Sequence, residues 1–303
     1  RGCIAKKSEG FSGRKREAST RDWAQAIQTL KPEHSLDMLL AIKGMARTTY
    51  YYNIRPREDK YAQLRKDIIR IFNKNKGRYG YRRVYQQLRS EGKDINHKTV
   101  AKLMVEMGLY ARKPKLRYRS YKGEVGKIAP NILQRDFATN APNRKWTTDV
   151  SQVDIHGKKC YISPILDMWN GEIISYVISD RPDLKMVVDM LQKAFRKHPH
   201  TKGLIMHSDQ GWHYQHMRYQ YLLREHGITQ SMSRKGNCLD NSVMENFFGL
   251  MKNELLYNNH WESIDDFKAA LKEYIRYYNN ERIKLKLKMS PVQYRTHFQN
   301  QVK

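Results

Sequence analysis

The sequence predicts an α/β protein in which a mixed-sheet domain follows a small all-α helix-turn-helix domain. From residue 144 onward, short β-branched runs and amphipathic helices alternate in the order βββαβαβα, which is typical of a mixed sheet covered by helices. Between residues 58 and 110, apolar residues recur at helical spacing in three blocks separated by glycines. The length of 303 residues suits about two domains.

Changes in composition along the chain divide it into five expected parts. A basic, partly helical segment comes first. A helix-turn-helix domain, a basic linker, the mixed-sheet core and a helical extension follow. We expect these parts at residues 1–52, 53–111, 112–142, 143–257 and 258–303.

The helical blocks have recognisable ends. A short helix is expected at Thr20–Leu30, and Ser35 can cap another that begins at Leu36. Three further helices are expected at Tyr61–Asn75, at Tyr81–Glu91 and from the cap residue Asn96 to Met107. The side chains expected to point inward from these three are Leu64, Ile68, Ile69, Phe72, Val84, Tyr85, Leu88, Val100, Leu103 and Met104.

The last two of these helices are joined by a glycine-containing turn, an arrangement typical of a DNA-binding helix-turn-helix. We expect Lys98, Thr99 and Lys102, near the start of the second helix, to face the DNA groove. A plain three-helix bundle is the alternative. The local excess of lysine and arginine argues against it.

A basic linker follows. Residues 112–122 hold six lysines and arginines in eleven positions, interleaved with Tyr118 and Tyr121. Such a segment can follow the phosphates of a nucleic acid, although a solvated interdomain linker is the alternative. The side chains expected to contact DNA are Arg112, Lys113, Lys115, Arg117 and Arg119.

The second half of the chain reads as strands and helices in turn. Asn170-Gly171 is a strong hairpin signal between two of the strands. Strands are expected at Trp146–Val153, Cys160–Asp167, Ile173–Ser179, Leu204–Ser208 and Ile228–Ser231. Helices are expected at Leu184–Arg196, Tyr214–Glu225, Val243–Leu256 and Ile264–Tyr278.

Three carboxylates stand out within this half. Asp149 lies on the first strand, Asp209 just past the fourth, and Glu245 on the first turn of a helix, so all three can meet at one edge of the sheet. Residues 150–208 and 210–244, 59 and 35 in number, separate them. Mg²⁺ prefers carboxylate oxygens, and two such ions can activate a nucleophile and neutralise a phosphate. The three residues are therefore candidate catalytic and metal-binding residues, with Mg²⁺ as the expected ion and Mn²⁺ as a substitute.

Neighbouring residues offer weaker candidates. Lys252 lies seven residues after Glu245, on nearly the same helix face, and is expected to contact DNA or to be a surface lysine. Arg234 and Lys235 lie in a glycine-containing loop that either grips DNA or is simply solvated. His207 is expected to pack or hydrogen-bond rather than bind Mg²⁺. Asp240 and Asn241 are expected to cap a helix.

The charge balance indicates the class of partner. The chain has 57 lysines and arginines against 30 aspartates and glutamates, a formal net charge of +27. Residues 1–142 carry +20 of it and residues 143–303 carry +7. Such a surface favours nucleic acid. The three cysteines show no disulfide or zinc spacing, which suits a reducing cytosol, and no membrane span or signal peptide is expected.

Several sequence motifs together resemble one family. They are Lys145-Trp146-Thr147-Thr148-Asp149, His207-Ser208-Asp209-Gln210-Gly211, the segment 231–241, Glu245-Asn246-Phe247-Phe248, Tyr277-Tyr278-Asn279-Asn280 and Met289-Ser290-Pro291. With them the chain resembles transposases of the insertion-sequence-three family, whose catalytic core is similar to retroviral integrase. The likeness runs from about residue 35 to the end.

The resemblance implies an RNase H-like fold, Mg²⁺ dependence and the catalytic triad Asp149, Asp209 and Glu245. It further implies that a DNA 3′ end is cut by water and then attacks another phosphodiester, without a covalent protein intermediate. The implied partners are double-stranded DNA, as terminal inverted repeats and as target, and further copies of the chain, at least a dimer. The implied location is the bacterial cytoplasm, in association with the nucleoid.

Two departures from the family accompany the resemblance. The family's full product usually has another helix-turn-helix and a coiled-coil segment, which are absent or only partly represented by residues 1–30. The segment 285–291 also lacks a glycine expected near Met289. Two other functions remain open: a DNA-binding regulator with this fold, and a nuclease that cuts without joining.

Overall fold

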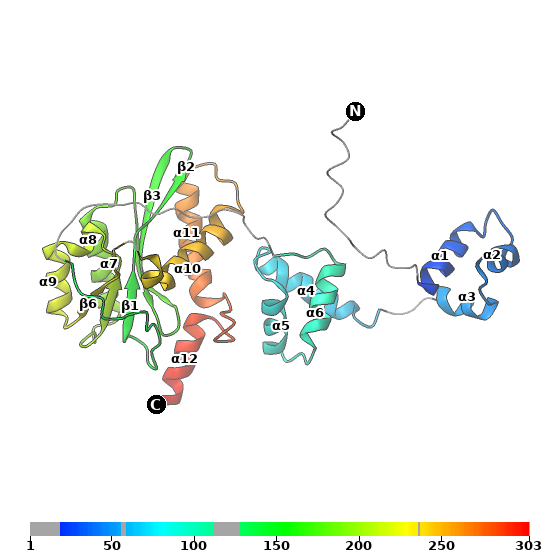
Figure 1. Ribbon diagram of the computed structural model, residues 1–303, viewed down its shortest axis with the longest axis horizontal. Helices are drawn as coiled ribbons and strands as arrows, with labels where there is room; N and C mark the ends of the chain where they lie inside the picture. The colour runs from blue at the N-terminus through cyan, green and yellow to red at the C-terminus, as the bar shows by residue number, and fades with distance from the viewer. Residues whose placement is uncertain (1–18, 56–58, 112–127, 236, 303) are drawn as a thin grey trace. The chain divides into compact units, whose positions relative to one another are not determined.

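The structure is a computed structural model that describes residues 19–55, 59–111, 128–235 and 237–302 (Figure 1). The chain forms two compact units, residues 1–63 and 64–303. The five parts expected from the sequence stay a prediction, while the α/β fold with helices ahead of a mixed sheet is confirmed. No helix in the described ranges is long and apolar enough to cross a membrane.

The first unit contains three short helices, α1 (Thr20–Leu30), α2 (Leu36–Lys43) and α3 (Arg47–Ile54). Ser19 caps α1, and Ser35 caps α2 as expected. The sequence-based prediction lacks α3, because the tyrosine run at residues 50–52 shows only a weak helical pattern of apolar residues. Its Tyr50 is buried against the apolar residues of the other two helices, Ala24, Ile27, Leu39 and Leu40.

The helix-turn-helix region consists of α4 (Ala62–Lys74), α5 (Tyr81–Ser90) and α6 (His97–Glu106), which confirms the three expected helices. Asn96 caps α6 by accepting a hydrogen bond from the Lys98 backbone N–H. One expected core position is wrong. Ile69 is exposed, and Ile71 is buried in its place, because the buried face of α4 runs through residues 64, 68 and 71.

A six-stranded mixed sheet forms the centre of the second unit. Its strands are β1 (Lys145–Thr148), β2 (Ser151–Ile155), β3 (Lys158–Asp167), β4 (Ile173–Ser179), β5 (Ile205–Ser208) and β6 (Thr229–Met232). β3 pairs antiparallel with β1, β2 and β4, while β5 lies parallel to both β1 and β6. Four strands joined by antiparallel pairing, β1 to β4, followed by the two parallel strands β5 and β6, give the RNase H-like arrangement.

The single strand expected at residues 146–153 is interrupted at Asp149. Thr148 pairs with Ile165 and Ser151 pairs with Ile162, so the register continues and Asp149 lies opposite Pro164. Proline has no backbone N–H to give to the ladder. The missing ladder hydrogen bond therefore accounts for the break, and it releases the backbone at the residue that carries the first carboxylate.

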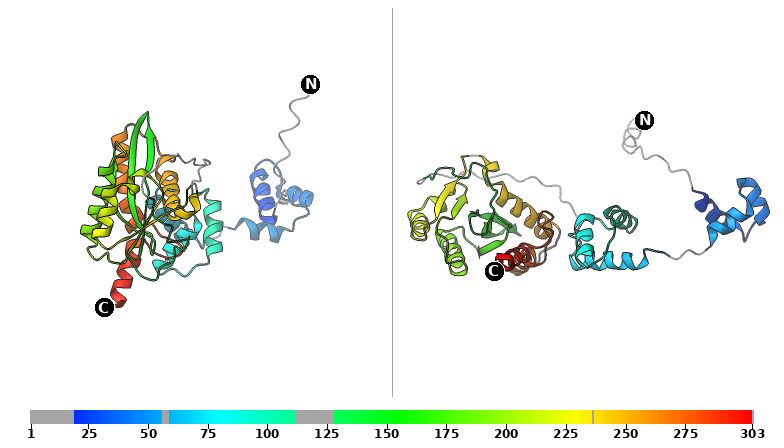
Figure 2. Two further views of the ribbon diagram at one scale, coloured as in Figure 1. Left: turned by 60° about the vertical axis from the view of Figure 1, so that its left-hand side comes forward. Right: turned by 90° about the horizontal axis from the view of Figure 1, so that it is seen from below.

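Helices cover both faces of the sheet (Figure 2). The helices α7 (Leu184–Lys197) and α9 (Met217–Glu225) pack on one face around Trp146. The other face carries α10 (Ser242–Met251) and α11 (Ile264–Asn280), while α12 (Pro291–Val302) packs against α11 and the β3–β4 turn. The one helix expected at 214–225 is wrong: α8 (Trp212–Gln215) is separate, because His216 has an extended backbone and caps α9.

The helix expected at 243–256 is also more complex. A 3₁₀ turn, η1 (Cys238–Asn241), precedes α10, and a π-helix, η2 (Lys252–Leu256), continues it. π-helical turns inside longer helices are frequent at functional sites. This one begins at Lys252 and contains Glu254.

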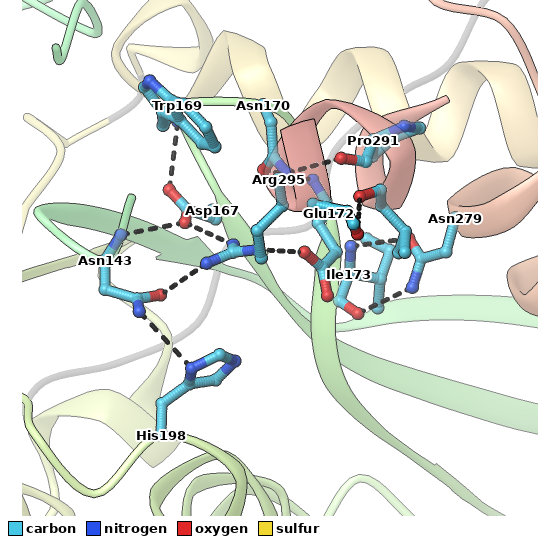
Figure 3. Close-up of polar contacts among 12 residues, drawn as sticks. Asn143, Asp167, Trp169, Asn170, Glu172, Ile173, His198, Asn279, Pro291 and Arg295 are labelled. Carbon is cyan, nitrogen blue, oxygen red and sulfur yellow. Dashed lines mark hydrogen bonds and ion pairs between the residues drawn. The ribbon is translucent and has the colours of Figure 1, made fainter. Parts of the chain in front are cut away.

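A buried polar network fastens α12 to the sheet (Figure 3). The Arg295 guanidinium donates to Asp167 at 2.7 Å and to Glu172 at 2.5 Å, and all three side chains are buried. Lys197 makes a second ion pair with Glu172 at 2.9 Å. Breaking a buried ion pair on one side costs about 3–5 kcal/mol, so α12 belongs energetically to the sheet domain.

In the turn before α12, a lysine takes the backbone conformation for which a glycine was expected. Lys284 and Met289 form an isolated antiparallel bridge, and the chain between them turns tightly. Lys288 has φ of 61°, in the left-handed region that favours glycine. The turn therefore keeps its form, with a lysine in a strained backbone conformation.

Candidate active site

Two of the three carboxylates lie side by side at the ends of neighbouring parallel strands. Thr147 of β1 pairs with His207 of β5, and each is followed two residues later by an aspartate. Asp149 and Asp209 therefore occupy matching register positions. Neighbouring strands lie about 4.8 Å apart, so the sheet itself brings the two carboxylates together.

Each aspartate accepts a hydrogen bond from a nearby backbone amide. Asp149 Oδ1 accepts from Val150 N–H at 2.7 Å, at the break between β1 and β2. Asp209 Oδ1 accepts from Gly211 N–H at 2.9 Å. A Cβ on Gly211 would lie 3.0 Å from Asp209 Oδ1, so only glycine leaves this carboxylate undisturbed.

Glu245 comes from the first turn of α10, and a buried hydrogen bond ties that helix to β1. Thr147 Oγ1 donates to Asn241 Oδ1 at 2.7 Å, and both side chains are buried. Thr147 precedes Asp149 by two residues, and Asn241 precedes Glu245 by four. This contact therefore fixes the start of α10 relative to the strand that carries Asp149.

The pKa of Asp149 responds to both of the other carboxylates. Burial raises the pKa of Asp149 well above its usual range, and the charges of Asp209 and Glu245 raise it further. Burial also raises the pKa of Asp209 and that of Glu245. Neighbouring acidic groups that resist ionisation form a site suited to a cation.

Lys252 faces the same site. It is partly buried, which lowers its pKa, while the charge of Asp149 acts in the opposite direction. Among the described residues, no three histidine, cysteine, aspartate or glutamate side chains already form a group that could hold a metal ion. The carboxylates are neighbours at one edge of the sheet, but they are not drawn together into a metal centre.

The loop before α10 is held by Asp240, whose side chain is fully buried. Its carboxylate accepts from Arg234 at 2.9 Å and from Arg135 at 2.8 Å, and those charges hold its pKa far below the usual range. Asp240 is thus an ion-pair centre rather than the expected helix cap. Arg234 is engaged there, although its side chain is 60% exposed. Lys235 is exposed.

Other candidate residues lie away from the carboxylates. His207 is fully buried, and its Nδ1 lies 2.9 Å from Ser231 Oγ on the neighbouring strand, which fits the expected hydrogen-bonding role. Lys98 and Lys102 are exposed on α6, and Thr99 is partly exposed. The contacts expected from the linker at Arg112, Lys113, Lys115, Arg117 and Arg119 lie outside the described residues.

Sequence reasoning missed several residues that support the site, and it was wrong about Asn241, which stands at the start of α10 but makes no capping hydrogen bond with its side chain. Thr147 and Asn241 brace α10, and Arg135 neutralises Asp240 across 105 positions of sequence. Tyr214 is buried, and the charges of Asp149 and Asp209 help to raise its pKa after burial itself. Only Thr147 carried a signal, since it alternates with Asp149 along one strand.

Comparison with known proteins identifies the family. Two models described as "Integrase core domain" match residues 139–238 and 245–298, and one described as "HTH-like domain" matches residues 58–117. The putative transposase InsK for insertion sequence element IS150 of Escherichia coli (strain K12) is 50% identical over 275 residues, covering 89% of this chain and 97% of the relative. The transposase InsF for insertion sequence IS3A of the same organism is 30% identical over 256 residues, covering 82% and 89%. The chain belongs to the insertion-sequence-three family of transposases.

Membership of this family indicates what the sheet domain does. An uncharacterized transposase-like protein of Haemophilus influenzae is also 50% identical, over 203 residues that cover 67% of this chain and 94% of that protein. The chain is thus an enzyme of DNA transposition with an integrase-type, RNase H-like core. The helix-turn-helix region expected from the sequence coincides with the matched HTH-like domain.

Proposed function

We propose that Asp149, Asp209 and Glu245 are the catalytic triad with which this transposase cuts and joins insertion-sequence ends. The observation that carries the proposal is the matched register of Asp149 and Asp209 on β1 and β5, with Glu245 in electrostatic contact with Asp149. The nucleophile is water in the cutting step and a DNA 3′-hydroxyl in the joining step. No covalent protein intermediate is needed, because the attacking oxygen comes from water or DNA.

The same three residues would hold a divalent metal ion. Their oxygen donors suit Mg²⁺, with Mn²⁺ as a substitute, and their raised pKa values mark a site where added positive charge is favourable. When bound, two such ions supply activation of the nucleophile and neutralisation of the phosphate. Lys252, beside Asp149, would hold a phosphate oxygen of the DNA end in line with the attacking group.

The remaining basic residues would bind DNA around this centre. Lys98, Thr99 and Lys102 would enter the groove of a terminal repeat, and Arg234, Lys235 and the linker arginines and lysines would contact the backbone. The transposase would act as at least a dimer, so that two ends meet, with target DNA as the further substrate. A location at the nucleoid in the cytoplasm belongs to the same proposal.

The test is a Mg²⁺-dependent assay on labelled DNA that carries the ends of the encoding element, with wild type beside Glu245→Gln. A joined product that disappears in the variant supports the triad. Cut DNA without joining would favour the nuclease, and binding without either reaction would favour the regulator. Equal binding of the DNA by both proteins is the control for folding.

Binding by α6 has its own test. Replacing Lys98 and Lys102 with alanine should weaken binding to the ends and reduce the slope of log affinity against log salt by about 2, because each phosphate contact contributes about 0.9. The matched control replaces Lys66 and Lys74, on α4, with alanine. Equal effects of the two pairs would move the recognition surface away from α6.

A further inference from the structure

A basic cavity lies where the helix-turn-helix region meets α10 and η2. A cavity of about 420 Å³ is bounded on one side by the turn between α4 and α5, with Lys76, Arg78, Arg82 and Arg83. Its other side is formed by the end of α10 and by η2, including Asn253 and Glu254. These walls belong to one compact unit of the chain.

Contacts to the core fix two of the arginines in place. Arg78 Nε donates to the Glu254 carbonyl at 3.2 Å, and its guanidinium lies over the Tyr277 ring at 4.9 Å. Arg83 Nε donates to the Ile283 carbonyl at 3.0 Å. Each of these bonds uses one donor of a guanidinium that has five, so further donors remain for a ligand.

The wall carries more positive charge than its own carboxylate neutralises. Arg282 takes both oxygens of Glu254, at 2.8 and 2.6 Å, and Tyr274 adds a hydrogen bond at 3.1 Å. In the part of the chain that the structure describes, no aspartate or glutamate forms an ion pair with Arg78 or Arg83. Partly buried cations without a counter-ion favour the binding of an anion.

The shape of the cavity narrows the choice of anion. A sphere of 420 Å³ is about 9 Å across, in the range of small-molecule pockets, so the cavity has room for a small group and not for a whole duplex. This size suits one nucleotide. Tyr81 offers a ring, with the Arg82 guanidinium 5.7 Å from its centre, and Asn253 offers an amide to a base.

We propose that this cavity binds one unstacked nucleotide of the DNA strand that the transposase processes. Arg78, Arg82 and Arg83 hold its phosphate, and the base lies against Tyr81 and Asn253. The inference rests on the proposed function and adds a subsite to it. Asn253 follows Lys252, which senses the charge of Asp149, so the bound nucleotide lies within a few nucleotides of the cleaved phosphate.

The experiment places 2-aminopurine, whose fluorescence rises when it leaves the base stack, at successive positions within six nucleotides of the cleavage site. Full-length transposase is added in EDTA, so that binding is observed without reaction. Fluorescence should rise several-fold at a single one of these positions. Arg82→Gln combined with Asn253→Ala should abolish the rise.

Arg89→Gln is the matched control, since Arg89 is an exposed arginine on the same helix and does not line the cavity. It should keep the full signal. A rise at no position, or the same rise in the cavity variant, would overturn the subsite. If the fluorescence rises but the same protein joins no DNA in the separate Mg²⁺ assay, the subsite stands and the proposed function is overturned. Thermal unfolding of each variant shows that the fold is intact.

Discussion

Replacing Asp149 with asparagine should make the metal-free transposase more stable while it removes catalysis. Asparagine has the same shape and can still accept the Val150 N–H, so the substitution removes only the charge. The ionised aspartate lies beside Asp209, and burial and that neighbour hold its pKa above the usual range. The folded protein therefore bears a repulsion that the unfolded chain lacks.

The size of the effect follows from the sheet. Two unit charges about 4.8 Å apart repel by about 3 kcal/mol at an effective dielectric constant of about 20. Both side chains are partly exposed, and salt screens them, so about 1–2 kcal/mol should remain. For a unit of this size that corresponds to a rise of about 2–8 °C in the midpoint of thermal unfolding.

The sign of the pH dependence is fixed by the direction of the shift. A carboxyl whose folded pKa is raised destabilises the fold only where the unfolded chain is ionised, and the penalty grows as pH rises toward the folded pKa. The advantage of Asp149→Asn should thus be larger at pH 8 than at lower pH, and it should vanish as pH falls to about 4, where the unfolded carboxyl is itself protonated.

Urea unfolding in EDTA at both pH values measures this difference. Asp209→Asn and the double variant complete the cycle, in which the second substitution should add less than the first. The reasoning fails if Asp149→Asn is no more stable than wild type at pH 8, if its advantage is the same at both pH values, or if the two substitutions add fully.

Three further substitutions test other features. Lys288→Gly should stabilise the protein by about 1 kcal/mol in urea unfolding, because it relieves a left-handed backbone; a loss of stability would remove the strain assigned to this turn. Gly211→Ala should lower strand transfer about tenfold or more without weakening DNA binding, since the new Cβ displaces the Asp209 carboxylate. Gly249→Ala, where a Cβ meets nothing within 4 Å, is its control and should keep full activity. Arg295→Met should cost about 3–5 kcal/mol in the same unfolding assay, and a cost below about 1 kcal/mol would contradict the role of the buried network.

Local patterns predicted most of the secondary structure. Strong helical periodicity placed α4, α5 and α6 within a residue or two, and Asn170-Gly171 located the turn before β4. Two predicted elements were wrong for reasons that the hydrophobic pattern does not show. The break at Asp149 depends on Pro164 of another strand, and the separation of α8 from α9 depends on the cap formed by His216.

In the candidate site, the carboxylates were predicted from the sequence and the residues that support them were not. Its three carboxylates were predictable because each lies in a distinctive motif near a strand end or helix start. The residues that hold them were not. Asn241 meets Thr147 across 94 positions, and Arg135 meets Asp240 across 105, and without the fold no pattern in a single sequence joins such pairs.

The position of Arg295 in the chain has a consequence for synthesis. Its two carboxylate partners belong to the β3–β4 hairpin, 128 and 123 residues earlier, so the ribosome makes the hairpin long before it makes the cation. Until α12 emerges, Asp167 has no ion-pair partner among the described residues, and Glu172 has only Lys197. The β3–β4 hairpin therefore gains its full set of ion pairs only when α12 is made, and we expect a chain cut short before α12 to be less stable than the whole chain.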